Sequence, residues 1–384
     1  MRAILLLLIV ACGAEARAAS RAPNCTLVAE DSGPDGKTAI RVEVVARGLE
    51  VPWALAFLPG GDLLVTERPG RIRLVRAGKL VGPPVARVDV DAGGEGGLMG
   101  LALDPKFSTN RRFFIYASFK EADRSVNRVE RWVLAADHRS ATREKVILDG
   151  LPRAAFHDGG RIHFGPDGML YVSVGDGRQP ERAQDPSAPN GKLLRITPDG
   201  AVPDDNPTRG SPVFLSGVRN CEAFAWPEPS DAKTLWLADH GPSGEWKGWH
   251  GADEIDVAHA GEDLGWPQIH LCDAEPGMTS PLLTWTDAVP PGGAAIYTGS
   301  KIPAWKGSLL VGVLGAKHLH RVAIDAKGKL LDHEVYLRGD PPNGYGRLRE
   351  VEMGPDGALY VTTSNCDGRG KCPKDKDYIL RITK

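Results

Sequence analysis

The sequence predicts an all-β chain that folds as a six-bladed β-propeller of four-stranded antiparallel blades. Short runs of β-branched and aromatic residues alternate with Gly, Pro, Asp and Asn, and helical periodicity is nearly absent. A Pro-Asp-Gly turn followed by an apolar strand occurs at 166–174 and again at 355–363, so one hairpin unit is used more than once. A β-sandwich is the competing architecture. Repeated hairpins without a break in composition favour radial closure, which leaves no long exposed edge strand.

The strand-like runs group into six units that use up the chain. We place them near residues 51–80, 97–135, 157–200, 215–260, 290–335 and 345–384. A strand at 41–46 would complete the last unit and join the two ends of the chain. We therefore expect an N-terminal segment at 20–40 and a single propeller domain at 41–384, without an interdomain linker.

The N-terminus has the pattern of a secretory signal. Arg2 precedes an apolar run at 4–10, and small residues follow to position 19. The run is too short to span a bilayer, and no other segment is apolar enough to do so. We expect residues 1–19 to be a signal peptide and the protein to be periplasmic or secreted. Because 9–12 resembles a lipoprotein cleavage box, a lipid anchor at Cys12 is the alternative.

The net charge and the cysteines limit the binding partners and the covalent links that we expect. A net charge of −2 argues against nucleic acid as a partner. Export permits disulfides. Cys366 and Cys372 flank a Gly-rich loop and are expected to pair, and Cys221 with Cys272 is a second pairing that leaves Cys25 free, although sequence does not fix the connectivity. No cysteine spacing is typical of a zinc or haem site.

Two segments carry candidate catalytic groups. His157 begins a Gly-rich loop before the first Pro-Asp-Gly hairpin, and the second copy of that hairpin has no equivalent histidine. One unit of the repeat therefore carries a proton-transfer group, although an isolated loop histidine more often caps a turn. Arg219 and Asn220 precede an apolar strand, where a guanidinium could stabilise developing negative charge. A surface salt bridge is the alternative for Arg219.

Two further segments carry candidate ligand groups. The loop 239–245 and the acidic segment 253–256 offer carboxylates and turn carbonyls, which calcium prefers, although acidic loops are often only solvated. Arg347 and Arg349 alternate along a predicted strand and share a face. Two adjacent guanidiniums repel unless they share an anion, so they indicate a polycarboxylate or phosphate ligand, with solvent-facing arginines as the alternative.

Taken in order, these motifs resemble the soluble PQQ-dependent glucose/sorbosone dehydrogenase family, close to its aldose sugar dehydrogenase branch. The resemblance runs from about residue 47 to the C-terminus, and its motifs are 48–53, 66–70, 97–102, the His157 loop, 191–195, 240–245, 265–267 and the arginine pair at 347 and 349. It implies a six-bladed propeller that binds pyrroloquinoline quinone (PQQ) and calcium.

The resemblance also implies roles for individual residues. His157 corresponds to the general base and Arg219 to the arginine beside the reacting carbonyl. The residues that correspond to cofactor contacts are Asn220, Arg347 and Arg349. The residues that correspond to calcium ligands are Gly241 and Pro242 through their carbonyls at the cofactor, and Glu254 with the carbonyl of Leu264 at a second, structural calcium.

Four departures from the family pattern stand near these positions. Glu95 replaces a glutamine near substrate and cofactor, and Cys221-Glu222 replaces Pro-Gln. Gly315 stands where a cofactor lysine is expected, which leaves Lys317 as the candidate. The insertion 246–251 adds two tryptophans, which we expect to stack on a sugar.

These features predict an enzyme that oxidises the anomeric carbon of aldose sugars to lactones, with PQQ and calcium as cofactors and an electron acceptor that the sequence does not identify. Three alternatives stay open. One is a dehydrogenase of a sugar aldehyde or a non-sugar alcohol. Another is a quinone-less, calcium-stabilised propeller that binds carbohydrate or protein. The third is a calcium-dependent lactonase.

Overall fold

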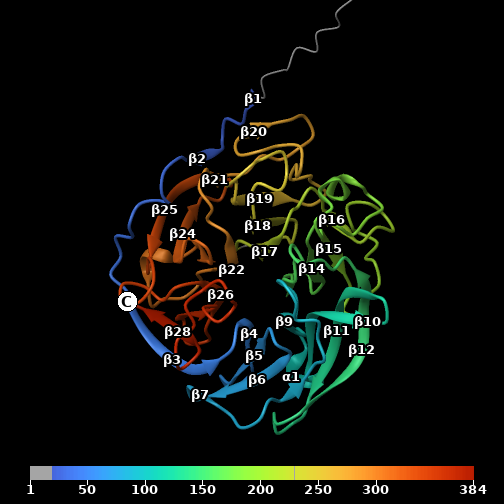
Figure 1. Cartoon of the computed structure of the whole chain (residues 1–384), viewed down its shortest axis with the longest axis vertical. Helices are drawn as coiled ribbons and strands as arrows, with labels where there is room; N and C mark the ends of the chain where they lie inside the picture. Colours follow the sequence, from blue (N-terminus) through green and yellow to red (C-terminus); the bar gives the residue numbers. More distant parts are fainter. Residues whose placement is uncertain (1–19, 229) are drawn as a thin grey trace, which may run out of the picture.

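The computed structural model describes residues 20–228 and 230–384, and the predicted signal peptide and Cys12 lie outside this part. Six small sheets stand around a central axis like the blades of a propeller (Figure 1). The helices of the described part are three to five residues long, and they are α1 (Phe107–Asn110), η1 (Pro180–Gln184) and η2 (Pro303–Trp305). None of its helices is long and apolar enough to cross a membrane.

The first three blades follow one another along the chain. Blade 1 contains β4 (Pro52–Phe57), β5 (Leu63–Glu67), β6 (Arg71–Arg76) and β7 (Lys79–Leu80), with β8 (Ala86–Arg87) also paired to β6. Blade 2 contains β9 (Leu98–Leu103), β10 (Arg112–Glu121), β11 (Arg124–Leu134) and β12 (Ala141–Leu151). Blade 3 contains β13 (Ile162–Phe164), β14 (Leu170–Val174), β15 (Lys192–Ile196) and β16 (Val213–Leu215).

The other three blades complete the ring. Blade 4 contains β17 (Cys221–Ala225), β18 (Thr234–Asp239), β19 (Glu254–His259) and β21 (Leu283–Trp285). Blade 5 contains β22 (Pro291–Ile296), β23 (Leu309–Val313), β24 (His318–Ile324) and β25 (Leu330–Tyr336). Blade 6 contains β26 (Leu348–Met353), β27 (Leu359–Thr363), β28 (Asp377–Thr383) and β3 (Arg41–Leu49).

The six-bladed prediction is confirmed, but three unit boundaries were wrong. The predicted units 97–135, 157–200 and 215–260 stop before the outer strands β12, β16 and β21. In blades 3 and 4 a long loop rich in Pro, Gly and Asp precedes the outer strand, and the outer strands β16 and β21 have only three residues each. A strand that short shows too little alternation to be recognised in the sequence.

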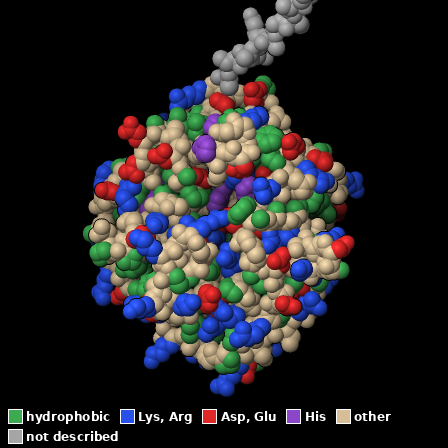
Figure 2. Space-filling view, in the orientation of Figure 1, with side chains coloured by type: hydrophobic (Ala, Val, Ile, Leu, Met, Phe, Trp, Pro, Cys, Tyr) green, Lys and Arg blue, Asp and Glu red, His purple; other side chains and the backbone are tan. Residues whose placement is uncertain are grey.

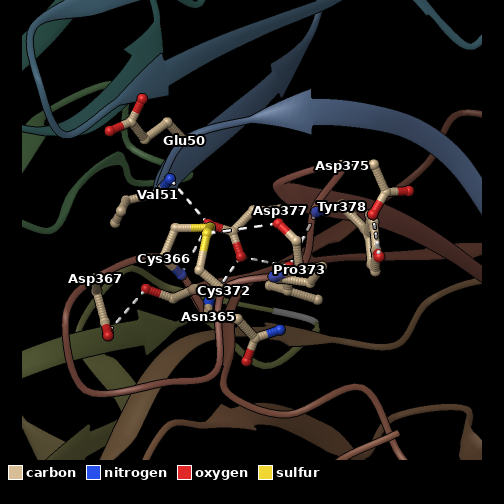
Figure 3. Close-up of a disulfide and its surroundings, with 12 residues drawn as sticks. Glu50, Val51, Asn365, Cys366, Asp367, Cys372, Pro373, Asp375, Asp377 and Tyr378 are labelled. Carbon is tan, nitrogen blue, oxygen red and sulfur yellow. Dashed lines mark hydrogen bonds between the residues drawn. A yellow bond between two sulfur atoms is a disulfide. The ribbon is translucent and has the colours of Figure 1, made fainter. Parts of the chain in front are cut away.

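The ring is closed by pairing the two ends of the chain. β3 pairs antiparallel with β28, with Arg41 opposite Thr383, as predicted. The buried carboxylate of Asp377 reinforces this seam (Figure 3). It accepts hydrogen bonds from the N–H of Val51 (3.0 Å) beside blade 1 and from the N–H of Asn365 (2.6 Å) in blade 6. One carboxylate thus joins the first blade to the last.

The N-terminal segment is fastened to the outside of blade 4. β2 (Thr26–Val28) pairs in parallel with β21, and β1 (Ser20–Arg21) pairs with β20 (Asp273–Ala274). The disulfide Cys25–Cys272 joins the same two segments, with the Cα atoms 5.6 Å apart. The expected pairing of Cys221 with Cys272 was therefore wrong. Cys221 begins the inner strand β17 and is buried and free, whereas Cys272 precedes β20 at the rim.

A buried ionic network lies where the innermost strands meet. Arg161 donates to the carboxylate of Glu350 and, over 2.7 Å, to the carbonyl of Glu222. Arg349 donates to the Glu222 carboxylate at 2.7 Å. Both guanidiniums lie over the ring of Trp53, 4.6 and 5.5 Å from its centroid. These residues belong to blades 1, 3, 4 and 6, so the network joins the blades at the centre of the ring.

Blade 5 contains three hydrogen-bonded histidines. The Nε2 of His318 lies 3.1 Å from the Nδ1 of His320, whose Nε2 lies 3.3 Å from the Nδ1 of His333. His318 and His320 are completely or almost completely buried. Because burial disfavours the charged form, the pKa of His318 falls to about 4 and that of His320 also lies below its usual value. The column is therefore neutral and acid-sensitive.

Peptide mapping under non-reducing conditions tests the disulfide connectivity. We expect a linked peptide pair containing Cys25 and Cys272. The double variant Cys25→Ser, Cys272→Ser should lose about 2–5 kcal/mol of unfolding free energy, because the crosslink restricts a long segment of the unfolded chain. A linked pair containing Cys221 would contradict the structure.

The buried histidines predict a loss of stability in acid. The pKa of His318 is about 4 in the folded protein and about 6.5 in the unfolded chain. As the pH falls through this interval the unfolded state binds a proton that the folded state does not, so the free energy of unfolding decreases. In His318→Leu the decrease between pH 7 and pH 4 should be smaller than in wild type by about 2–3 kcal/mol. Urea unfolding followed by tryptophan fluorescence measures it, and equal decreases in both proteins would refute the assignment.

Candidate functional site

A cavity of about 470 Å³ opens at the centre of one end of the ring, above the ionic network. Loops from several blades supply its walls, and Figure 2 shows Arg, Lys and His side chains gathered around this central hollow. Seven of the residues predicted for the site line the cavity, and they are Glu95, His157, Arg219, Asn220, Gly241, Pro242 and Arg347.

The imidazole of His157 is held between an acidic and a basic side chain. Its Nδ1 lies 2.7 Å from Oδ1 of Asp176, and its Nε2 lies 2.8 Å from a terminal nitrogen of Arg219. A carboxylate accepts and a guanidinium only donates, so Nδ1 carries the proton and Nε2 presents a lone pair. The structure therefore gives His157 the tautomer that a general base requires, with the lone pair at the cavity wall.

Asp176 is fixed independently of the histidine. Its side chain is completely buried, and it accepts hydrogen bonds from the indole N–H of Trp266 (2.9 Å) and the backbone N–H of Arg178 (2.8 Å). His157 itself has a φ of +67°, which is uncommon for a residue other than glycine. Its N–H is held at 2.9 Å by the carboxylate of Glu95. His157 is thus held through both its ring and its backbone.

Arg219 lies at the centre of the cavity wall. Besides His157, its guanidinium binds the carboxylate of Glu245 and the carbonyl of His240, while its buried Nε has no partner. The N–H groups of Arg219 and Asn220 both donate to the buried carboxylate of Asp239, over 2.7 Å each. This carboxylate fixes the turn that aims Arg219 at His157.

Glu95 is an ionised group at the cavity edge. Burial alone would raise its pKa, but the N–H of His157 and the positive charge of Arg369 outweigh burial, so the pKa lies below its usual value. Arg369 binds the second oxygen of this carboxylate at 2.9 Å. The negative charge that Glu95 introduces, in place of the glutamine that the family resemblance implies, is therefore balanced by Arg369 and by the N–H of His157.

The predicted arginine pair divides between two carboxylates. Arg347 lines the cavity and binds Asp367 at 2.8 Å. Arg349 belongs to the ionic network through Glu222 and is not among the residues that line the cavity. The anion that we expected the two guanidiniums to share is thus supplied by two protein side chains.

Two sequence expectations fall outside the cavity. Lys317 binds Asp340 at 2.9 Å and does not line the cavity, whereas Leu314 and Gly315 do. The tryptophans at 246 and 249 do not line it either. Trp249 stacks on His270 with the ring centroids 4.5 Å apart, and the ammonium of Lys247 covers it at 4.6 Å. The indole of Trp249 is thus covered by His270 and Lys247, so its ring is not free to stack on a sugar.

The candidate calcium ligands lie together beside the main cavity. The backbone of Gly241 and Pro242 lines both the main cavity and a small adjoining one of about 20 Å³, which Asp239, Glu254 and Leu264 also line. Burial and the neighbouring carboxylates raise the pKa of Glu254 well above its usual range. The described residues contain no cluster of three or more His, Cys, Asp or Glu side chains in metal-binding geometry, so a cation here would depend on carbonyl oxygens.

Sequence reasoning missed several residues of the cavity. Three of them, Phe156, Arg178 and Arg369, line the cavity, and a fourth, Asp176, lies behind its wall and holds the ring of His157. Asp176 had a local signal, because it sits between two glycines directly after a predicted strand. The others lie on loops, and no sequence pattern says which loop residues turn toward the axis.

Three of the known proteins that this chain resembles are named as sugar dehydrogenases. The chain is 32% identical to the aldose sugar dehydrogenase YliI of Escherichia coli K12, over 86% of this chain and 91% of the relative. The solved structure of a putative oxidoreductase (glucose dehydrogenase) from Thermus thermophilus is 42% identical with a TM-score of 0.80, over 90% of this chain and 100% of the other. The PQQ-bound aldose sugar dehydrogenase of Streptomyces coelicolor is 33% identical with a TM-score of 0.78, over 92% and 99%.

Residues 49–380 match the family model described as glucose/sorbosone dehydrogenase. The match spans all six blades and leaves out β1, β2, most of β3 and the end of β28. The fold, the cavity with its oriented histidine, and the relatives agree on one assignment. The chain belongs to the glucose/sorbosone dehydrogenase family, whose solved relatives include a PQQ-bound aldose sugar dehydrogenase of the same fold.

Proposed function

We propose that the protein oxidises the anomeric carbon of aldose sugars to lactones, with PQQ and calcium as cofactors and His157 as the general base. The observation that carries the proposal is the imidazole at the cavity wall whose Nε2 accepts from Arg219 while Asp176 holds its Nδ1. An imidazole whose Nδ1 is held by a carboxylate is oriented to accept a proton at Nε2. The family relationship supports the redox chemistry.

The residues of the cavity fit the quinone. PQQ is a flat tricarboxylate, and the cavity of about 470 Å³ offers the guanidiniums of Arg219 and Arg347 and the amide of Asn220. The Nε of Arg219 and the Nε2 of His240 are buried and without partners, as expected of donors that await a ligand. When bound, PQQ supplies the redox chemistry by accepting hydride from the sugar.

The chain's own residues handle the proton. The anomeric hydroxyl of the sugar would replace Arg219 as the partner of His157 Nε2, and the imidazole would take its proton. Asp176 stabilises the imidazolium that forms, because its carboxylate is already bound to the Nδ1 proton. Arg219, which Glu245 still holds, would then donate to the substrate oxygen and stabilise its developing negative charge.

We place calcium at the carbonyls of Gly241 and Pro242, and a second calcium between Glu254 and the carbonyl of Leu264. Both sets line the small cavity beside the base, where a divalent cation would favour the ionised forms of the surrounding carboxylates. We leave Lys317 out of the site and assign Arg349 to holding Glu222 beneath the cofactor. Two disulfides are consistent with export by the predicted signal peptide.

Replacing the base tests the mechanism. In His157→Ala reconstituted with PQQ and calcium, kcat for dye reduction with aldoses should fall by about 10²–10⁴-fold, the usual contribution of a general base. PQQ titration by absorbance should be unchanged. Asp176→Asn should retain more activity than His157→Ala and alter the pH profile of kcat. Full activity in His157→Ala would refute the assignment.

The two cationic candidates for cofactor binding are predicted to behave differently. Arg347→Ala should weaken PQQ binding by about 10-fold or more, because a charge-assisted hydrogen bond contributes about 1.5–3 kcal/mol. Lys317→Ala removes the same charge outside the cavity and should leave PQQ affinity unchanged. Fluorescence titration of both variants decides between them. Equal losses would contradict the exclusion of Lys317 from the site.

A further inference from the structure

An exposed aromatic side chain stands at the mouth of the cavity. Phe156 is 38% exposed and is one of two large apolar side chains that are exposed in the described part of the chain. It lines the cavity directly before His157. The guanidiniums of Arg178 and Arg369 both approach its ring, 5.9 and 5.5 Å from the centroid. One phenyl ring therefore carries two cations at the entrance.

The positive charge at the mouth is only partly compensated. Arg369 binds Glu95 at 2.9 Å, but Arg178 has no acidic partner within the residues that the structure describes. The other carboxylates that line the cavity are committed elsewhere. Glu245 binds Arg219, and Asp253 accepts the N–H groups of Gly241 and Val289. Two guanidiniums close to one ring, one of them without a carboxylate partner among the described residues, favour the binding of an anion at the mouth.

Each part of this mouth is tied to the catalytic base. Phe156 is joined to His157 by a peptide bond. The backbone N–H of Arg178 donates at 2.8 Å to the same Asp176 oxygen that binds the imidazole. Arg369 binds the carboxylate whose other oxygen accepts the N–H of His157. An anion held at the mouth would therefore lie in a fixed position relative to the proton-accepting nitrogen.

We propose that Phe156, Arg178 and Arg369 form an anion-binding subsite that selects aldoses carrying a carboxylate or phosphate remote from the anomeric carbon. The inference rests on the proposed function and names its substrate class as acidic sugars. The anion would bind the guanidiniums while the anomeric hydroxyl reaches His157. Arg178 is a specificity residue in this scheme, and the proton step itself is unchanged.

Kinetics with matched sugars tests the subsite. The protein loaded with PQQ and calcium is assayed with D-glucuronate, glucose 6-phosphate and D-glucose. Wild type should prefer one or both acidic sugars, and the two acidic arms distinguish carboxylate from phosphate. In Arg178→Gln, kcat/KM for the preferred acidic sugar should fall about 10-fold, mainly through KM, since a charge-assisted contact is lost. Glucose should change by less than about 2-fold, because it makes no such contact.

Two further variants separate local from general effects. Arg178→Lys keeps the charge and should restore most of the selectivity. Arg209→Gln removes one charge from an exposed site outside the cavity lining and should change nothing. An equal loss for glucose and glucuronate in Arg178→Gln would overturn the proposal, as would a loss of PQQ affinity, which would assign Arg178 to the cofactor.

A binding measurement tests the anion subsite separately from the proposed dehydrogenase activity. Calorimetric titration of the purified protein with glucuronate should show affinity that falls with added salt and is reduced about 10-fold in Arg178→Gln. If no sugar supports turnover but this binding pattern holds, the proposed function fails and the subsite stands. If glucose is oxidised normally and glucuronate does not bind, the subsite fails alone.

Discussion

The buried ionic network at the centre of the ring is the constraint on which the rest of the structure depends. A propeller has a hole where its innermost strands meet, and this protein fills it with Arg161, Arg349, Glu222 and Glu350 around the ring of Trp53. Such ions are costly to bury and are tolerated only when each has a partner. Because the charged partners come from blades 3, 4 and 6, none of these three blades can shift without leaving a charge unpaired.

The network also limits what the neighbouring backbone can be. Gly293 in β22 leaves the space that the ion pair occupies, since a Cβ atom there would lie 2.3 Å from Glu350 Oε1. Carboxylates also hold the residues of the cavity wall in position. Asp176 holds the imidazole, Glu95 holds its backbone and Asp239 holds the turn of Arg219. The geometry of the site is thus fixed by carboxylates, none of which accepts the substrate proton in the proposed chemistry.

The propeller fold could be predicted from the sequence because the patterns that indicate it lie within short segments. Hairpins such as 166–174 combine turn residues with alternating apolar residues, and their repetition predicts the ring. Outer strands such as β16 follow long loops and were assigned wrongly. The candidate base was found because a single histidine interrupts a Gly-rich loop. Its partner Asp176 and the rim residue Arg369 were missed, because only the folded ring brings loops of different blades together. The disulfide between Cys25 and Cys272 was missed for the same reason. Only folding brings the N-terminal strand β2 beside β21, which lies more than 250 residues later in the chain.

The short loop closed by Cys366 and Cys372 has a consequence for the order of the cavity wall. Figure 3 shows this bridge beside Asp367, and the loop also carries Arg369. Through these two residues the bridge steadies both Arg347 and Glu95. Reduction of this bridge would release the loop that carries Asp367 and Arg369 without breaking any strand pairing of the six blades. The cavity wall would then lose order while the ring stays intact.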